Sequence, residues 1–192
     1  MKKNKIYILV AIGSMFMLSG CIHRELFESI PSVKSNTPMS TVTSTKPTKI
    51  ISRTSFPTTE YQRLRRSGDM SVKGTIFITN LDGKKIYGKH TRLYLNPVTS
   101  YSRQWYRESY IGGHKMAKTD SRLYNYLKFT TSNARGKFAF YGVARGSYYV
   151  VGTVKCALEC GYDTPKVIRI AKEITVGSPD STNISLSKSS YN

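Results

Sequence analysis

Short runs in which β-branched and aromatic residues alternate with polar ones recur from residue 71 to the end of the chain, and glycine, proline and asparagine turns separate them. Runs of this length predict β-strands rather than helices. The run at 147–154 is apolar on both sides of the alternation, so we expect it at the centre of a sheet. Short strands at this spacing favour an all-β sandwich. The predicted strands are 71–79, 91–95, 127–131, 137–141, 147–154, 166–170, 172–176 and 183–187.

Residues 98–128 break this alternation and form a long insertion between two predicted strands. We expect the insertion to be partly helical, with one short helix capped by Ser100 or Ser102 and another capped by Thr119 or Asp120. An insertion of this length is much longer than a plain strand connection. Features particular to one protein are most often found in such segments.

The composition of the insertion suits a binding surface. Interleaved tyrosine, tryptophan and arginine are enriched at protein interfaces, and the same mixture suits stacking on sugars or single-stranded nucleic acid. We therefore predict a partner-binding surface here; the alternative is that the aromatic residues only cover one end of the sandwich. The candidate residues are Tyr101, Arg103, Trp105, Tyr106, Arg107, Tyr110, Lys115 and Arg122.

The start of the chain looks like a targeting segment. Three lysines precede an apolar run at 6–17, which is the pattern of a signal peptide and is too short to span a bilayer. The run ends in Leu18-Ser19-Gly20-Cys21, which resembles the lipobox of bacterial lipoproteins. The resemblance implies that residues 1–20 are removed and that Cys21 is acylated as the first mature residue. The alternative is a buried helix that happens to end in cysteine.

The residue after the predicted lipid anchor bears on location. In enteric-type lipoproteins an aspartate at this position retains the protein in the inner membrane, and this chain has Ile22 instead. We therefore expect a lipid anchor in the outer membrane, facing either the periplasm or the cell exterior.

Residues 21–71 are predicted to form a disordered linker between the anchor and the sandwich. Between residues 31 and 59, 18 of the 29 residues are serine, threonine or proline, with few apolar residues to bury. Near the end of this segment, Arg63, Arg65 and Arg66 form a basic cluster. The cluster is either an ordinary solvated charge run or a contact for anionic headgroups.

The formal net charge of +19 favours anionic partners such as phospholipid headgroups, lipopolysaccharide phosphates or acidic proteins. The alternative is a basic surface that only keeps the protein soluble. Nucleic acid is not among the partners we expect.

The cysteines divide into the predicted lipid anchor and one nearby pair. In an oxidising compartment Cys156 and Cys160 favour a local disulfide, with free thiols and metal or redox chemistry as the alternatives. His23, His90 and His114 are scattered, and there is no second cysteine pair. We expect no metal and no cofactor.

The segment 136–150 reads Gly-x-Phe-x-Phe-x-x-Val-x-x-Gly-x-Tyr-Tyr-Val. With the Asp82-Gly83-Lys84 turn, Gly161-Tyr162 and the terminal run at 184–186, this order resembles a carboxypeptidase regulatory-like domain over residues 72–187. The resemblance implies a seven-stranded prealbumin-like sandwich, also found in transthyretin, so we assign residues 72–192 to this domain. Such domains are usually accessory modules without catalytic residues.

The motif also predicts local contacts. Phe138 and Phe140 lie on one face of their strand, and we expect Tyr148 and Val150 to meet them across a strand ladder. The turn glycines that bound this motif allow positive φ.

The sequence contains no paired carboxylates, no metal-ligand spacing and no glycine-rich phosphate loop, so we expect a protein that is not an enzyme. The leading hypothesis is an outer-membrane lipoprotein that acts as a structural or adaptor subunit of a cell-envelope assembly, such as a secretion or conjugation apparatus. The alternative is a stand-alone envelope lipoprotein that binds an anionic glycan or lipopolysaccharide. The expected partners are therefore the membrane, envelope proteins and an anionic surface or glycan.

Overall fold

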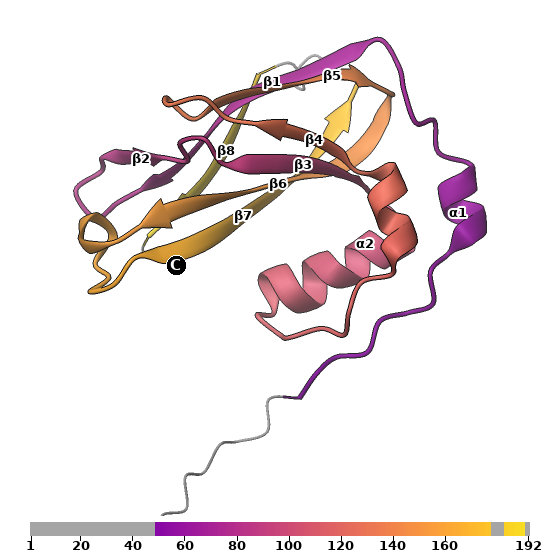
Figure 1. The fold of residues 1–192 in the computed structure, drawn as a ribbon, viewed down its shortest axis with the longest axis horizontal. Helices are drawn as coiled ribbons and strands as arrows, with labels where there is room; N and C mark the ends of the chain where they lie inside the picture. Colours follow the sequence, from indigo (N-terminus) through magenta and orange to yellow (C-terminus); the bar gives the residue numbers. More distant parts are fainter. Residues whose placement is uncertain (1–48, 178–182, 191–192) are drawn as a thin grey trace, which may run out of the picture. The chain divides into compact units, whose positions relative to one another are not determined.

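The computed structural model describes residues 49–177 and 183–190, which form two four-stranded sheets (Figure 1). The structure is mostly β with few helices, as the strand pattern predicted. The predicted signal peptide, Cys21 and the linker as far as residue 48 lie outside the described residues. Within the described part of the chain, no helix is long and apolar enough to cross a membrane.

The first sheet is built around β1 (Met70–Thr79). It pairs antiparallel with β5 (Lys137–Val143) through residues 70–75 and with β2 (Lys85–Tyr87) through residues 77–79. It pairs in parallel with β8 (Asn183–Ser189) through residues 73–79. Because the pairing with β8 overlaps both other pairings, β2 and β5 share one edge of β1 and β8 occupies the other.

The second sheet has the order β4-β3-β6-β7 and is antiparallel throughout. Its strands are β3 (Arg92–Pro97), β4 (Lys128–Thr131), β6 (Gly146–Cys156) and β7 (Lys166–Val176). The run at 147–154 was expected at the centre of a sheet, and β6 does lie between two neighbours. In register, Val151 faces Tyr94 on one side and Ala171 on the other.

The seven strands that the family resemblance implied are too few, because the described residues contain eight. The predicted strands at 166–170 and 172–176 are one strand, β7, because Ala171 is buried in the ladder opposite Val151 instead of forming a turn. The short strand β2 was missed, since three residues are too few for a periodic pattern to be visible.

The main core lies between the sheets and follows the strand alternation. Leu93 and Leu95 of β3 are fully buried in the same cluster as Ile76 of β1. The aromatic pair at 138 and 140 joins Tyr148 and Val150 in this core, but across the sandwich and not across a ladder, because β5 pairs with β1. Gly136 and Gly146 take φ values of 71° and 145°, as the turns require.

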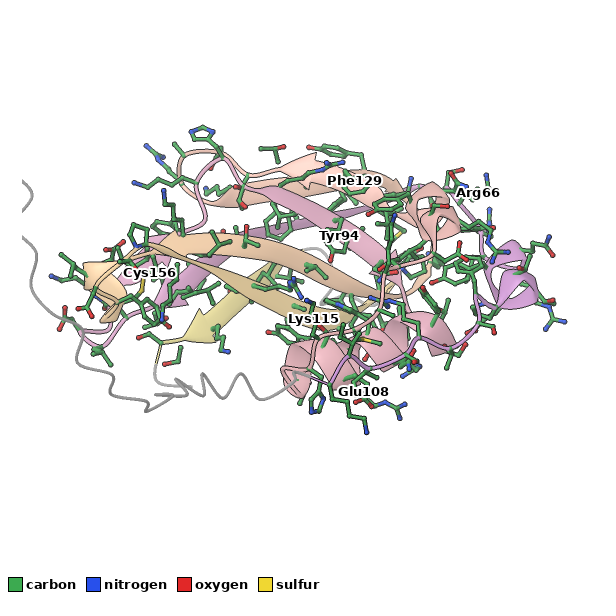
Figure 2. All side chains as sticks on the ribbon, turned by 60° about the horizontal axis from the view of Figure 1, so that its bottom comes forward. Arg66, Tyr94, Glu108, Lys115, Phe129 and Cys156 are labelled. Carbon is green, nitrogen blue, oxygen red and sulfur yellow. A yellow bond between two sulfur atoms is a disulfide. The ribbon has the colours of Figure 1, made fainter. Side chains whose placement is uncertain are left out.

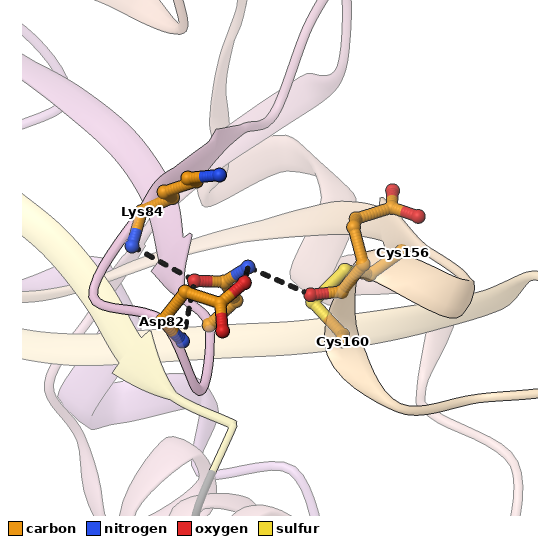
Figure 3. The surroundings of a disulfide bond; sticks show 6 residues. Asp82, Lys84, Cys156 and Cys160 are labelled. Carbon is orange, nitrogen blue, oxygen red and sulfur yellow. Dashed lines mark hydrogen bonds between the residues drawn. A yellow bond between two sulfur atoms is a disulfide. The ribbon is translucent and has the colours of Figure 1, made fainter.

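The predicted disulfide between Cys156 and Cys160 is confirmed, with 5.9 Å between the Cα atoms. Figure 3 shows Asp82 and Lys84, in the turn after β1, beside the disulfide loop. Asn80 belongs to the same turn, and its side chain is buried. Asn80 Oδ1 accepts hydrogen bonds from the backbone N–H groups of Asp82 and Lys84 at 3.1 and 2.8 Å, and its Nδ2 donates to the Glu159 carbonyl at 2.9 Å. One buried amide therefore ties the β1–β2 turn to the disulfide loop.

We expect Asn80→Ala to lower the free energy of unfolding by about 2 kcal/mol, because it removes three partly buried hydrogen bonds and leaves backbone groups on both loops without their partner. Asn133→Ala is the matched control. Asn133 Oδ1 also accepts two backbone hydrogen bonds, from Arg135 and Lys137, but in an exposed turn. We expect the control to lose about 1 kcal/mol in urea unfolding. Equal losses would contradict a link between the two loops.

Candidate functional site

The insertion folds over the outer face of the second sheet. It begins with α2 (Ser100–Trp105), continues as the π-helical turn η1 (Tyr106–Ile111) and ends with the 3-10 helix η2 (Ser121–Tyr126). The cap of α2 is Thr99, and neither Ser100 nor Ser102 as expected. Thr99 Oγ1 accepts from the Ser102 N–H at 3.2 Å, while Ser102 Oγ accepts from the Thr99 N–H at 2.8 Å. Asp120 caps η2, as predicted.

An aromatic cluster joins the insertion to this outer face. Trp105, Tyr106 and Tyr110 pack against Tyr149 and Val151 of β6. The rings of Tyr106 and Tyr149 stack with 4.4 Å between centroids and 11° between planes. Burial is the main cause that raises the pKa of Tyr149 to about 12. Because both sides of β6 are covered, its residues do not alternate between apolar and polar.

Residues 49–66, which we call the strap, lie against the insertion. The predicted disordered linker is therefore wrong for this part of the chain. The strap contains the short helix α1 (Thr58–Gln62), in which Tyr61 is fully buried. Phe56 stacks on Tyr61 with 4.5 Å between ring centroids, and Tyr61 Oη accepts a hydrogen bond from Thr99 Oγ1 at 2.9 Å. A few apolar side chains in a serine- and threonine-rich segment pack against the insertion, and Glu60 accepts hydrogen bonds from the backbone N–H and the hydroxyl of Ser100.

Two arginines hold the strap to the insertion. The Arg122 guanidinium lies 4.6 Å from the Phe56 ring centroid, and its Nη2 is 2.7 Å from Asp120 Oδ2. Hydrogen bonds from Arg122 lower the pKa of Asp120 to about 2. Arg53 lies over the Tyr101 ring at 5.4 Å, and its Nε donates to the Ala117 carbonyl at 2.7 Å.

The eight residues predicted to form one partner-binding surface are thus divided. Tyr101 is buried, and Arg122 contacts the strap. Trp105, Tyr106 and Tyr110 are half-buried against the sheet, whereas Arg103, Arg107 and Lys115 are exposed. The aromatic side chains therefore cover the sandwich, as the alternative interpretation expected. The cations around them face the solvent.

Between the insertion, the strap and the sheet lies a cavity of about 180 Å³. Tyr94 and Asn96 of β3 contribute to its lining, and Trp105 contributes from α2. Tyr124 and Phe129 are the exposed members of the lining, with 63% and 41% of their surfaces accessible. Tyr94 and Phe129 lie next to each other in Figure 2, and their ring centroids are 6.1 Å apart. Arg53, Tyr101, Ser102, Thr119, Leu123 and Leu127 complete the lining.

One polar atom of the cavity lining has no partner. Asn96 is only 4% exposed, and its Oδ1 makes no hydrogen bond with any described residue. A buried amide oxygen is normally satisfied, because leaving it unpaired costs about 1–3 kcal/mol. Asn96 Oδ1 is therefore an acceptor available to the donor of a ligand.

The sequence did not predict this cavity. Its lining combines two members of the predicted surface, Tyr101 and Trp105, with residues from elsewhere. Strand residues such as Tyr94 and Asn96 contribute, and so does Arg53 from the predicted linker. The one available signal was Asn96, a polar residue at an outward position of a strand next to the insertion. Asn96 becomes part of a cavity only because the insertion folds back over its strand. The local sequence pattern does not encode that folding. The described residues contain no cluster of His, Cys, Asp or Glu that could hold a metal ion.

No family model and no curated protein matches the sequence. Among solved structures, a proposed carbohydrate-binding protein from Pseudomonas aeruginosa aligns over 71% of this chain and 99% of its own, with a TM-score of 0.60 and 23% identity. The two chains share a β-rich fold. An (S)-allantoin synthase aligns over 66% of this chain and 43% of its own, with a TM-score of 0.34 and 15% identity, a likeness too weak to support a conclusion.

The strap should make the protein sensitive to alkali. Burial raises the pKa of Tyr61 to about 12, whereas the unfolded chain releases this proton near pH 10. Between these values the unfolded state binds fewer protons than the folded one, so the free energy of unfolding falls as pH rises, by about 3 kcal/mol in total for this group. Below pH 10 the contribution of the Tyr61 hydroxyl to the free energy of unfolding is fully present.

We expect Tyr61→Phe to cost about 1 kcal/mol at neutral pH through its lost hydrogen bond, and to reduce the loss of stability between pH 10 and 12. Tyr141→Phe is the control, because 69% of Tyr141 is exposed. Urea unfolding at several pH values measures both variants. An unchanged pH dependence in Tyr61→Phe would contradict the burial of this hydroxyl.

Proposed function

We propose that this protein is a non-enzymatic envelope lipoprotein that binds a saccharide in the cavity beneath its insertion. The observation that supports the proposal most is the unpaired Asn96 Oδ1 in an aromatic-lined cavity. Ligand sites in proteins are mostly apolar clefts with a few well-placed polar groups, and this cavity has that composition. A sugar ring offers C–H faces to the aromatic side chains and a hydroxyl to the amide oxygen.

The charge of the chain supports an anionic saccharide over a neutral one. The full sequence has 30 Lys and Arg against 11 Asp and Glu. Arg53 lines the cavity, and Arg92 lies 4.1 Å from the ring centroid of Phe129 at its exposed side. No acidic residue is among those lining the cavity. A positive potential at the site would raise the association rate of a charged sugar.

The structural neighbour agrees with the proposal without deciding it. A chain of the same fold is a proposed carbohydrate-binding protein, but one fold hosts many functions. The cavity and its unpaired Asn96 Oδ1 therefore carry the proposal. We also propose that the sandwich is of the prealbumin-like type, as its resemblance to carboxypeptidase regulatory-like domains implies, with the insertion as its addition.

The binding proposal predicts that acidic oligosaccharides bind and that Asn96→Leu weakens them about tenfold or more, because the hydroxyl partner is lost. The probes are a phosphorylated lipopolysaccharide core oligosaccharide and a uronate oligosaccharide, with a neutral glucan for comparison. Calorimetry measures affinity. Trp105 is the only tryptophan in the chain and lines the cavity, so its fluorescence should change on binding.

Asn125→Leu is the matched control, because Asn125 is exposed on η2 and is not among the residues that line the cavity. We expect it to bind like the unmodified protein. Since Asn96 Oδ1 has no partner in the protein, we expect Asn96→Leu to remain folded, which thermal unfolding checks. Equal affinity of the two variants, or no binding of any probe, would exclude this site.

We further propose that Cys21 anchors the chain in the outer membrane by its lipid. The support is the lipobox-like sequence that ends at Cys21, together with Ile22 after it. We expect Cys21→Ala to abolish labelling by a fatty-acid probe and to release the protein from membranes or leave it unprocessed. Cys156→Ser is the control and should still be labelled. Persistent labelling of Cys21→Ala would disprove the anchor.

The adaptor role in a secretion or conjugation assembly stays a prediction from the sequence. It does not require the cavity. A stoichiometric complex recovered from membranes would support it, and an isolated monomer would favour the saccharide-binding protein.

A further inference from the structure

The described chain begins next to one loop of the insertion. The Ile51 N–H donates to the Lys115 carbonyl at 2.8 Å, and the Ala117 N–H donates to the Ile51 carbonyl at 2.8 Å. These bonds form a parallel bridge between Ile51 and Met116. In this register Ile50 lies beside Lys115. The sequence that precedes Lys49, including Cys21, is therefore joined to the domain at this loop.

The end of η1 lies against the same loop. The His114 N–H donates to the Glu108 carbonyl at 2.9 Å, and the Gly112 N–H donates to the Arg107 carbonyl at 2.9 Å. Glu108 and Lys115 are on the same side of the molecule in Figure 2. The residues 49–51 and 107–118 thus form one continuous surface, which we call the entry patch.

The entry patch combines cations with exposed aliphatic side chains. Ile50 and Ile111 expose 53% and 67% of their surfaces, which is unusual for isoleucine. The only acidic residue in the patch is Glu108, and its carboxylate lies 3.5 Å from the His114 ring. The patch therefore has a net positive charge. Its exposed cations are Lys49, Arg107, Lys115 and Lys118.

This combination is the one that binds at a membrane surface. Lysine and arginine attract anionic lipids, by about fivefold in affinity for each cation near the surface. Exposed aliphatic side chains add contact with the boundary between headgroups and acyl chains. A protein partner would be expected to bury aromatic residues, and none is among the exposed large apolar residues of the patch.

We propose that the entry patch contacts the anionic phospholipid headgroups of the membrane to which the chain is attached. The inference rests on the proposed anchor at Cys21, because the chain that leads to this anchor leaves the domain at the patch, at Lys49. Figure 2 shows Phe129 on the opposite side of the molecule from Glu108. In this orientation the exposed aromatic side of the saccharide cavity is turned away from the bilayer.

The test uses the mature, membrane-extracted protein reconstituted into vesicles of phosphatidylcholine alone or of phosphatidylcholine mixed with phosphatidylglycerol. Backbone hydrogen exchange is measured by mass spectrometry. We expect exchange at 49–52 and 107–118 to slow several-fold with the anionic vesicles only, and the protection to disappear at about 0.5 M salt, where charges are screened.

A charge-reversed variant with Arg107→Glu, Lys115→Glu and Lys118→Glu should lose this protection. The control reverses three exposed lysines near the disulfide end, Lys84→Glu, Lys89→Glu and Lys155→Glu, and should keep it. Equal exchange in both vesicles would overturn the inference alone. So would protection confined to the arginine cluster at 63–66. A chain that floats with neither vesicle would overturn the anchor and this inference with it.

Discussion

The apolar outer face of the second sheet must be covered, and the insertion and the strap are arranged around that need. Tyr149 and Val151 point away from the main core and would be exposed in a bare sandwich. The stacking of Tyr106 on Tyr149 shields this face and fixes where α2 and η1 lie. Burial of such area is worth roughly 25 cal/mol per Å², so an uncovered face would be both unstable and prone to association.

Covering that face leaves a gap, and the gap is the candidate site. Helix α2 and η1 lie over the β6 side of the sheet, while η2 and the strap enclose the β3 side. The fully buried Tyr61 and the capped start of α2 hold these segments in place through Thr99. A site held by packed elements loses little further freedom when a ligand binds, which favours affinity. The same segments bring Asn96 under cover without giving its oxygen a partner.

The sequence was informative where structure is local and periodic. Alternation located most strands, and the four-residue spacing of the two cysteines led to the disulfide that forms. Prediction from the sequence failed where the structure of one segment depends on its contacts with another. Nothing local marks Ala171 as a ladder residue instead of a turn, because its burial comes from its partner strand. The strap was missed because its composition is that of a disordered chain, and only three of its apolar side chains, Phe56, Tyr61 and Leu64, join the cluster that docks it. The cavity combines residues from strands, insertion and strap, so it becomes visible only when the fold is known.

If the cavity beneath the insertion is a saccharide site, its lining should respond to a bound sugar. Isotopically labelled protein can be titrated with an acidic oligosaccharide and followed by nuclear magnetic resonance. We expect the signals of the Asn96 side-chain amide and the Trp105 indole to shift together and to saturate at one affinity. Saturable shifts confined to other surfaces, with these two signals unmoved, would contradict it.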